Sequence, residues 1–309
     1  MALSVSASAQ EWPSEPIKMI VPFSAGGGSD PVARLLAEGL SERLGQPVLV
    51  EFQPGASATI GANMVAQAEP DGYTILLTSN TPVVNVEYTI PDLPYDMEDL
   101  VPIAEVTGST VMIVANSNFE PNTFAEMVDY AKENPGKINL AIQGVGGLSH
   151  FAAALIEYRA GAEFNLVPYK GAGDLQADLL SGVVDMGIGF PTAFISGVEP
   201  GRLKFIGSLA DERLETLPDV QTTEEQGFPQ IKASAWLMLF GPKGLPQDVI
   251  DEIVVATNDF LETDEAKKSL GELGYTVPVE SGPEKAAALL DRDRQDFKEI
   301  FESGAMDLN

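Results

Sequence analysis

The sequence predicts an α/β protein made of two similar domains. Short apolar runs that end in glycine-rich loops alternate with segments whose apolar residues recur at helical spacing. One such strand, loop and helix, within residues 17–44, is echoed by a second within residues 138–156. Strands that alternate with helices form crossover connections, so both regions are expected to build α/β sheets.

The first domain begins with a buried strand at Ile17 to Phe23, whose apolar run stops at three consecutive glycines. A helix follows, with Gly45 as its C-cap and an apolar face made of Val32, Leu35, Leu36, Leu40 and Leu44. The next predicted elements are a strand at Pro47–Phe52, a short helix through Ile60, Met64 and Val65, a stop at Pro70–Gly72, and a strand at Tyr73–Thr78. Residues 81–107 are rich in proline and predict irregular backbone.

The second domain is expected to begin with a strand at Val111–Ala115. A strand at Ile138–Ile142 follows, and a glycine-rich loop then leads into a helix opened by Ser149 and His150. A third glycine-containing segment, from Asn165 to Asp174, precedes a helix with Leu175, Leu179 and Leu180. The last predicted strand of this domain is Val183–Phe190. An apolar run at Ala233–Phe240 leads into a mostly helical remainder with too few strands for a third domain. The predicted limits are 12–107 with 233–309 for domain 1, and 108–232 for domain 2.

Composition narrows the possible partners. The 309 residues contain 18 Lys and Arg against 46 Asp and Glu, a formal net charge of −28. Such a field repels nucleic acid and anionic lipid, so neither is an expected partner. Cysteine is absent, which removes thiolate nucleophiles, disulfides and cysteine-ligated metals. No apolar run reaches the length of a membrane span.

The N-terminus contains Ala7-Ser8-Ala9 before Gln10, a small-x-small pattern like a signal-peptidase site. A basic segment and a full apolar segment are missing before it. Residues 1–11 are therefore interpreted as the remnant of an export signal, with an ordinary tail of small residues as the alternative. The first interpretation predicts a periplasmic protein.

The glycine-rich loops do not fit a nucleotide site or a catalytic site. In "GGGSDP", Gly26 and Gly28 match a dinucleotide fingerprint and Glu51 follows at a passable distance, but Pro31 takes the place of the third glycine. No P-loop motif occurs. His150 is the sole histidine and no GxSxG motif is present, so a serine triad has little support. A dinucleotide-dependent oxidoreductase remains an alternative, but no catalytic residue, cofactor or metal is predicted.

The loops do fit a site for a small anion. The first turn of a helix presents backbone N–H groups and the positive end of its dipole, and glycine lets a ligand approach that backbone. In an open α/β sheet such loops lie at the carboxyl ends of the strands, where ligands bind. Lys170 on the third loop would add one positive charge, and Asp174 after it is a good candidate for the N-cap of the following helix. The alternative for each loop alone is an ordinary turn between strand and helix.

Two residues in these loops have an ordinary structural alternative. Asp30 is expected to cap its helix by accepting from the N–H of Val32 or Ala33, with Pro31 at the first helical position and Arg34 as an ion-pair partner. It could also hold bound water or a ligand donor. His150 either contacts the ligand or makes a local bond at its helix N-terminus.

Several segments resemble one family of solute receptors. They are "PIKMIVPFSAGGGSDPVARLLAEGL", "LGQPVLVEFQPGASATIGANMVAQAEPDGYTILL", "GVGGLSH", "VPYKGAGDLQADLLSGVVD" and the stretch from Trp236 to Pro246. These segments are similar to the Bug-type periplasmic binding proteins of tripartite tricarboxylate transporters. The resemblance runs from about residue 12 to residue 305, nearly the whole chain.

The resemblance implies a type II periplasmic-binding-protein fold, in which two α/β domains are joined by two crossing strands and close on a small organic acid. It implies that a ligand carboxylate lies between the first loop and the Gly144–Ser149 loop. Family members usually carry hydroxyl residues where this chain has Ile142 and Gly147, and a glycine where it has Ser57. Contacts through the backbone survive those changes, but contacts from side-chain hydroxyls do not.

The resulting hypothesis is a non-enzymatic, monomeric periplasmic receptor that captures a mono-, di- or tricarboxylate, including aromatic acids, and delivers it to membrane permease subunits. A sensory protein that signals to a membrane partner is the main alternative. The predicted ligand-binding residues, with Thr78 to Asn80 and Phe190 at the far end of the cleft, are Phe23, Ser24, Gly27, Gly28, Ser29, Asp30, Thr78, Ser79, Asn80, Gly144, Val145, Gly146, Gly147, Ser149, His150, Tyr169, Lys170, Gly171, Asp174 and Phe190.

Overall fold

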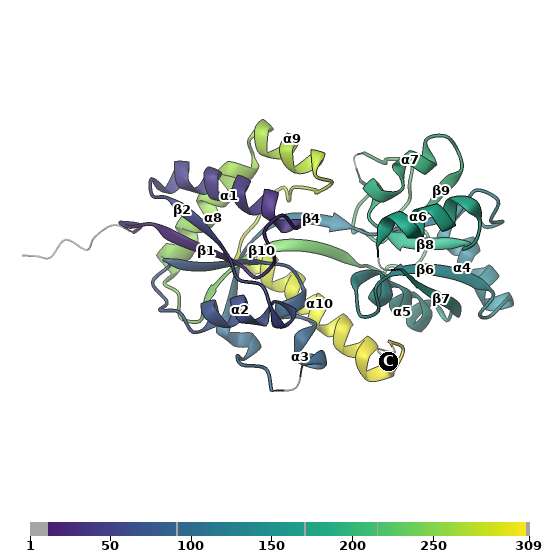
Figure 1. Cartoon of the computed structure of the whole chain (residues 1–309), viewed down its shortest axis with the longest axis horizontal. Helices are drawn as coiled ribbons and strands as arrows, with labels where there is room; N and C mark the ends of the chain where they lie inside the picture. Colours follow the sequence, from purple (N-terminus) through teal and green to yellow (C-terminus); the bar gives the residue numbers. More distant parts are fainter. Residues whose placement is uncertain (1–11, 91, 170, 215, 307–309) are drawn as a thin grey trace, which may run out of the picture. The chain divides into compact units, whose positions relative to one another are not determined.

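Figure 1 shows the computed structural model, which describes residues 12–90, 92–169, 171–214 and 216–306. The predicted export-signal remnant at residues 1–11 and the predicted site residue Lys170 lie outside the described residues. The described residues form two compact units. The first contains those up to 107, 236–272 and 276–293, and the second contains 108–235, 273–275 and those from 294 onward. The predicted domain limits stay a prediction.

The first unit is built on a five-stranded sheet in the order β2-β1-β3-β10-β4. The bounds of these strands are β1 Ile17–Val21, β2 Val48–Phe52, β3 Thr74–Thr78, β4 Leu100–Thr110 and β10 Ser234–Pro242. β1 pairs in parallel with β2 and β3, whereas β10 pairs antiparallel with β3. Parallel strands buried on both faces need mostly apolar sequence. β1 supplies it as IKMIV, in which only Lys18 is exposed, and β3 supplies it as the buried ILL of TILLT.

Helices cover both faces of this sheet, with α1 and α8 on one side and α2 on the other (Figure 1). Gly39 lets α1 approach α8, because a Cβ atom at that position would lie 2.1 Å from the ring of Phe260. The helices of this stretch of the chain are α1 Ser29–Leu44, α2 Thr59–Ala66, α3 Val86–Thr89, α8 Gln247–Leu261, α9 Asp264–Glu272 and α10 Pro283–Ser303, with short 3-10 turns at Ala56–Ala58, Thr81–Val83 and Met97–Asp99.

The second unit contains another five-stranded sheet, in the order β7-β6-β8-β5-β9. Its strands are β5 Met112–Asn116, β6 Ile138–Gln143, β7 Phe164–Tyr169, β8 Met186–Gly189 and β9 Leu203–Ser208. Its helices are α4 Phe124–Glu133, α5 Leu148–Ala160, α6 Ala172–Ser181 and α7 Ile195–Val198, with a 3-10 turn at Pro191–Ala193. α5 and α6 lie on opposite sides of this sheet in Figure 1.

The two sheets share one plan, which confirms the predicted echo. β6 pairs in parallel with β7 and β8, as β1 does with β2 and β3, and β5 pairs antiparallel with β8, as β10 does with β3. The expectation of parallel crossovers holds for these three strands in each unit but not for whole sheets. Both sheets are mixed, because β5 and β10 run against their neighbours.

The chain passes between the units within two strands, β4 and β10, and again at residues 273–275 and within α10. β4 contains residues of the first unit up to Thr107 and of the second from Gly108, and β10 contains second-unit residues up to Ala235 and first-unit residues from Trp236. The predicted irregular stretch 81–107 is wrong at its end, where β4 begins at Leu100. Proline within that strand masked its β pattern in the sequence. These are the two crossing strands that the fold requires.

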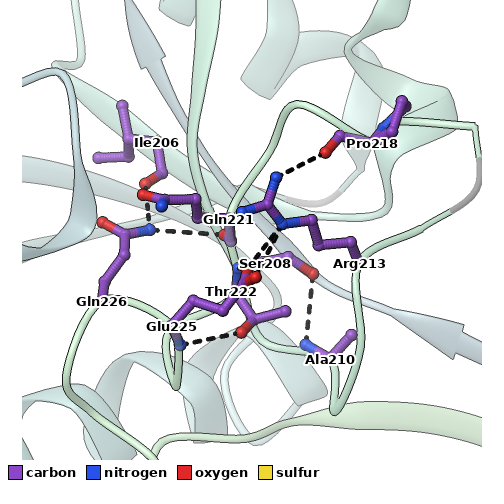
Figure 2. A network of polar contacts seen from close by, with 9 residues as sticks. All are labelled: Ile206, Ser208, Ala210, Arg213, Pro218, Gln221, Thr222, Glu225 and Gln226. Atoms are coloured by element: carbon purple, nitrogen blue, oxygen red, sulfur yellow. Dashed lines mark hydrogen bonds and ion pairs between the residues drawn. The ribbon is translucent and has the colours of Figure 1, made fainter.

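A polar network in the second unit, drawn in Figure 2, holds the segment between β9 and β10 in place. The Oε1 atom of Gln226 accepts from the N–H groups of Phe124 and Ala125 at 2.7 and 3.4 Å, at the start of α4. Its Nε2 atom donates to the carbonyl oxygens of Ile206 and Gln221 at 3.2 and 3.4 Å. One side chain therefore satisfies two helix N–H groups that have no partner within α4.

We predict that Gln226→Ala lowers the free energy of unfolding by about 1–3 kcal/mol, because it leaves half-buried helix N–H groups and a strand carbonyl without their partner. Urea denaturation followed by circular dichroism measures the change. Gln295→Ala, at an exposed position of α10, is the matched control and should stay within about 0.5 kcal/mol of the parent. Equal losses in both variants would contradict the role assigned to Gln226.

Candidate functional site

The predicted site residues of the first unit lie at the carboxyl edge of its parallel strands. The loop after β1 carries Phe23 to Gly28, and Ser79 and Asn80 directly follow β3. β1 and β3 are parallel neighbours, so both segments leave the sheet at the same edge. Ser24 to Gly28 are exposed, whereas Ser29 and Asp30 are buried. The structure thus places the glycine backbone at the surface of this unit.

The loop after β1 is held by its own hydrogen bonds. The Gly27 N–H donates to the Ser24 carbonyl at 3.1 Å, and the Gly26 N–H donates to Oδ2 of Asp30 at 2.6 Å. Gly26 has a φ of 79°, a backbone conformation that residues with a Cβ atom rarely adopt. Both bonds stabilise the loop, and one of them occupies the N–H of Gly27, a predicted ligand-binding residue.

Asp30 does not cap α1, and this prediction is wrong. The N-cap is Gly28, which makes no side-chain cap bond, and Asp30 is the second residue of the helix. Its carboxylate reaches back to Gly26, because a side chain on the first turn of a helix faces the preceding loop. The predicted partner is confirmed, since Nε of Arg34 lies 2.5 Å from Oδ1 of Asp30.

The electrostatics of Asp30 follow from these contacts. The N–H of Gly26, and then the Arg34 guanidinium, hold the pKa of Asp30 below its usual value against the opposing effect of desolvation. Asp30 is therefore a fixed carboxylate that organises the loop from behind. A loop that is organised before a ligand arrives loses less entropy on binding.

The residues after β3 have unequal surroundings. Thr78 is fully buried, and its hydroxyl oxygen has no hydrogen-bond partner among the described residues. Ser79 and Asn80 are half-buried. The Nδ2 atom of Asn80 donates to Oδ2 of Asp293 on α10 at 2.8 Å. Asn80 is thus oriented by a partner that the sequence did not reveal.

In the second unit, the loop after β6 and the first turn of α5 carry the predicted residues from Gly144 to His150. Val145 is 52% exposed, whereas Ser149 and His150 are buried. The Ser149 hydroxyl accepts from the Gln143 N–H at 2.7 Å, and Nδ1 of His150 accepts from the Gly146 N–H at 3.0 Å. The local interpretation of His150 is therefore confirmed, and Nδ1 carries no proton in this arrangement.

The loops after β7 and β8 leave the same edge, because both strands are parallel neighbours of β6. The Tyr169 hydroxyl donates to Oδ2 of Asp178 at 2.7 Å, and desolvation together with that carboxylate raises the pKa of Tyr169 to about 12. Asp174 is not an N-cap, since Gly171 holds that position in α6. The predicted strand at Val183–Phe190 shortens to β8, which leaves Phe190 in the following loop, 36% exposed.

The structural reason for glycine differs among the positions of these loops. Gly144 and Gly146 have positive φ values of 74° and 80°, and a Cβ at Gly147 would lie 2.9 Å from the Gln143 carbonyl oxygen. Gly171 differs, because its backbone is extended, with φ −165°, and a Cβ there would meet nothing within 4 Å. Neither backbone geometry nor the neighbouring protein atoms require glycine at 171.

Sequence reasoning missed one feature of the first unit's predicted residues and indicated another. The missed feature is the carboxylate of Asp293 on α10, which accepts hydrogen bonds from Asn80 and from Trp236 on β10. Nothing in the sequence around Asp293 or Trp236 indicates these bonds. The turn after β2 holds three non-glycine residues with positive φ, namely Ala56, Ser57 and Ala58. The "PGASAT" stretch did signal this turn, since glycine is the residue that such a conformation favours.

The described residues form neither a metal-binding cluster nor a membrane-spanning helix. No group of three or more His, Asp and Glu side chains in these ranges is arranged to hold a metal ion. Within the same ranges, every helix is too short or too polar to cross a bilayer. The site that remains consists of loops with many backbone N–H groups at two sheet edges, each in its own unit.

Comparison with known proteins identifies the family. A model described as the tripartite tricarboxylate transporter family receptor matches residues 32–302. Protein BugT of Bordetella pertussis is 33% identical over 306 residues, covering 98% of this chain and 94% of that protein. A TctC solute-binding protein from Polaromonas, solved with no ligand, has a TM-score of 0.88 at 26% identity and covers 94% of this chain and 99% of its own. MatC from Rhodopseudomonas palustris with bound malate has a TM-score of 0.67 at 28% identity, covering 94% of this chain and 99% of its own.

The fold and its loops define a solute-binding protein of the type II periplasmic-binding-protein class, with two α/β domains of mixed sheets. Within that class, the chain belongs to the tripartite tricarboxylate transporter receptor family, the family of the Bug proteins. The resemblance stated from the sequence is thereby confirmed.

We predict that Asp30→Asn destabilises the protein at pH 7 and that the difference from the parent shrinks in acid. Because the folded-state pKa of Asp30 is lowered, its stabilisation is complete above the ordinary carboxyl value of about 4 and is lost as pH falls through the folded-state value. Urea midpoints between pH 7 and pH 3 measure the difference. Glu38→Gln, which changes an exposed carboxyl on α1, is the matched control and should stay within about 0.5 kcal/mol of the parent at pH 7. A difference in stability between Asp30→Asn and the parent that stays constant from pH 7 to pH 3 would contradict a lowered pKa of Asp30 in the folded protein.

Proposed function

We propose that this protein is an exported receptor that binds a small organic carboxylate and delivers it to the membrane subunits of a tripartite transporter. Family membership is the observation that carries this proposal. A relative of known structure, MatC, binds malate, which supports a carboxylate as the ligand class. The residues expected to contact the ligand are those predicted above, with the loops of both units contributing.

The physical chemistry of the loops supports an anion as ligand. The helices α1, α5 and α6 each begin directly after a glycine-rich loop at a carboxyl edge, where their first-turn N–H groups and dipoles favour negative charge. A protein with net charge −28 repels anions at long range, so its site must attract them over short distances. Fixed backbone dipoles supply that attraction without a cluster of cationic side chains.

The hydrogen bonds inside the loops refine the proposal. The N–H groups of Gly27 and Gly146, which the sequence suggested as ligand donors, are bonded within their own loops. The proposal therefore assigns carboxylate binding to the first turns of the helices, with these inner bonds holding the loops in shape. A ligand that contacts both units then favours the arrangement in which both reach it, and the permease is proposed to recognise that liganded form.

Calorimetric titration with mono-, di- and tricarboxylates and aromatic acids tests the ligand class. At least one acid is expected to bind with a dissociation constant below the millimolar range. The matching amides or alcohols, which lack the negative charge, should not bind. The amide and alcohol series is the control for non-specific heat. The proposal fails if no carboxylate in the panel binds more tightly than millimolar.

Delivery to a transporter needs a separate test. Vesicles that contain the membrane subunits of a tripartite tricarboxylate transporter should accumulate the bound acid only when the receptor is added. Accumulation at the same rate without the receptor would contradict delivery while leaving carboxylate binding intact.

We predict that Gly171→Ala weakens carboxylate binding at least about tenfold with no loss of stability, since its Cβ meets no protein atom and would meet only a ligand at the start of α6. Gly271→Ala on α9, where a Cβ also meets nothing within 4 Å, is the control and should bind normally. Valine at Gly27 or Gly146 is a poorer probe. A Cβ at Gly27 lies 3.0 Å from the Ser24 carbonyl oxygen, and Gly146 has a φ of 80°. Unchanged affinity in Gly171→Ala would remove this loop from the site.

A further inference from the structure

A half-buried carboxylate on α10, that of Asp293, fixes the orientation of Asn80. Oδ2 of Asp293 accepts from Nδ2 of Asn80 at 2.8 Å and from Nε1 of Trp236 at 2.8 Å. Its other oxygen, Oδ1, accepts from Nε and Nη2 of Arg292 at 3.1 and 3.0 Å. The Asp293 side chain is only 13% exposed, and Trp236 is 1% exposed. All four residues belong to the first unit.

The chemistry of these partners decides which end of the Asn80 amide faces Asp293. An ionised carboxylate can only accept hydrogen bonds, and the Trp236 indole and the Arg292 guanidinium can only donate them. If the Asn80 amide were turned over, its carbonyl oxygen would face the carboxylate oxygen and the bond would be replaced by repulsion. The amino group of Asn80 is therefore committed to Asp293.

The carbonyl end of the amide remains for another partner. Within the described part of the chain, Oδ1 of Asn80 makes no hydrogen bond, and the side chain is half-buried in the segment that directly follows β3. An amide oxygen accepts hydrogen bonds and repels a carboxylate. A half-buried acceptor that is held in place and left unpaired is suited to a ligand with an O–H or N–H group.

We propose that Asp293 is a positioning residue that makes Asn80 a hydrogen-bond acceptor, so that the site prefers carboxylates that also carry a hydroxyl or ammonium group. The preference rests on the proposed carboxylate-binding function and extends it. First-turn N–H groups recognise the carboxylate, whereas the oriented Asn80 oxygen recognises a donor elsewhere on the same ligand. A site that requires a donor rejects analogues that lack it, because its acceptor is left unpaired.

Pairs of acids that differ in one hydroxyl test the preference. Malate against succinate, lactate against propionate, and 4-hydroxybenzoate against benzoate cover three ligand sizes. In the parent protein, the hydroxyl member of a pair that binds should bind about three- to tenfold more tightly, the range expected of one neutral hydrogen bond. Equal affinities within every pair that binds would overturn the inference while leaving carboxylate binding established.

Three variants separate positioning from general stability. Asp293→Ala and Asn80→Ala should both bring the affinity ratio of a pair close to one, because the first frees the amide and the second removes it. Asp291→Ala, which removes an exposed carboxyl from the same helix, should keep the parent ratio. Melting temperatures show which variants are folded. A parent-like ratio in folded Asp293→Ala or in Asn80→Ala would overturn the proposal.

A ligand-free measurement tests the positioning directly in the parent protein. The Asn80 amino protons and the Trp236 indole proton donate to one oxygen, so nuclear Overhauser contacts should connect them. Absence of these contacts in assigned spectra would overturn the positioning role even if carboxylates bind. Their presence would support it even if the carboxylate panel fails, so the two proposals fail separately.

Discussion

The first unit depends on the insertion of β10 between β3 and β4. This strand comes from residues 234–242, far along the chain from the strands it joins, and it pairs antiparallel with β3 through Met238, Leu239 and Phe240. Without it, the N–H and C=O groups along one side of β3 would be buried without partners, and each such group costs about 1–3 kcal/mol. The same strand places Trp236 beside Asp293, so the order of the sheet also determines the surroundings of Asn80.

The loops at the carboxyl edges use hydrogen bonds in two separate ways. Asp30 and His150 each accept from an N–H group in the loop that precedes their own helix, and Ser149 accepts from the N–H of Gln143 at the end of β6. These inner bonds fix the backbone, and the first-turn N–H groups of the helices remain the natural positions for an anion. Rigid loops suit a receptor, because little conformational entropy is left to lose when the ligand binds.

The acidity of the chain and its proposed ligand are compatible for a physical reason. Net charge acts over a distance that salt shortens to roughly 8–10 Å, whereas backbone dipoles act at hydrogen-bond range. A receptor can therefore be strongly acidic overall and still favour a carboxylate at the start of a helix. Arg34 adds no free positive charge to the first loop, because its guanidinium is paired with Asp30.

Sequence alone determined the alternation of strands and helices, the echo between the two units and the family. Apolar periodicity and glycine placement are local properties, so β1, α1, β2, β3, β6 and α5 were predictable within a few residues. β9 at Leu203–Ser208 was not identified, because this strand has only six residues and they are of mixed polarity. Only the tertiary structure decided that both sheets are mixed, that Gly28 and Gly171 rather than Asp30 and Asp174 are the N-caps, and that Asp293 holds Asn80. These features depend on contacts between segments distant in sequence, or on the direction a side chain takes from its helix, and neither is encoded in a local pattern.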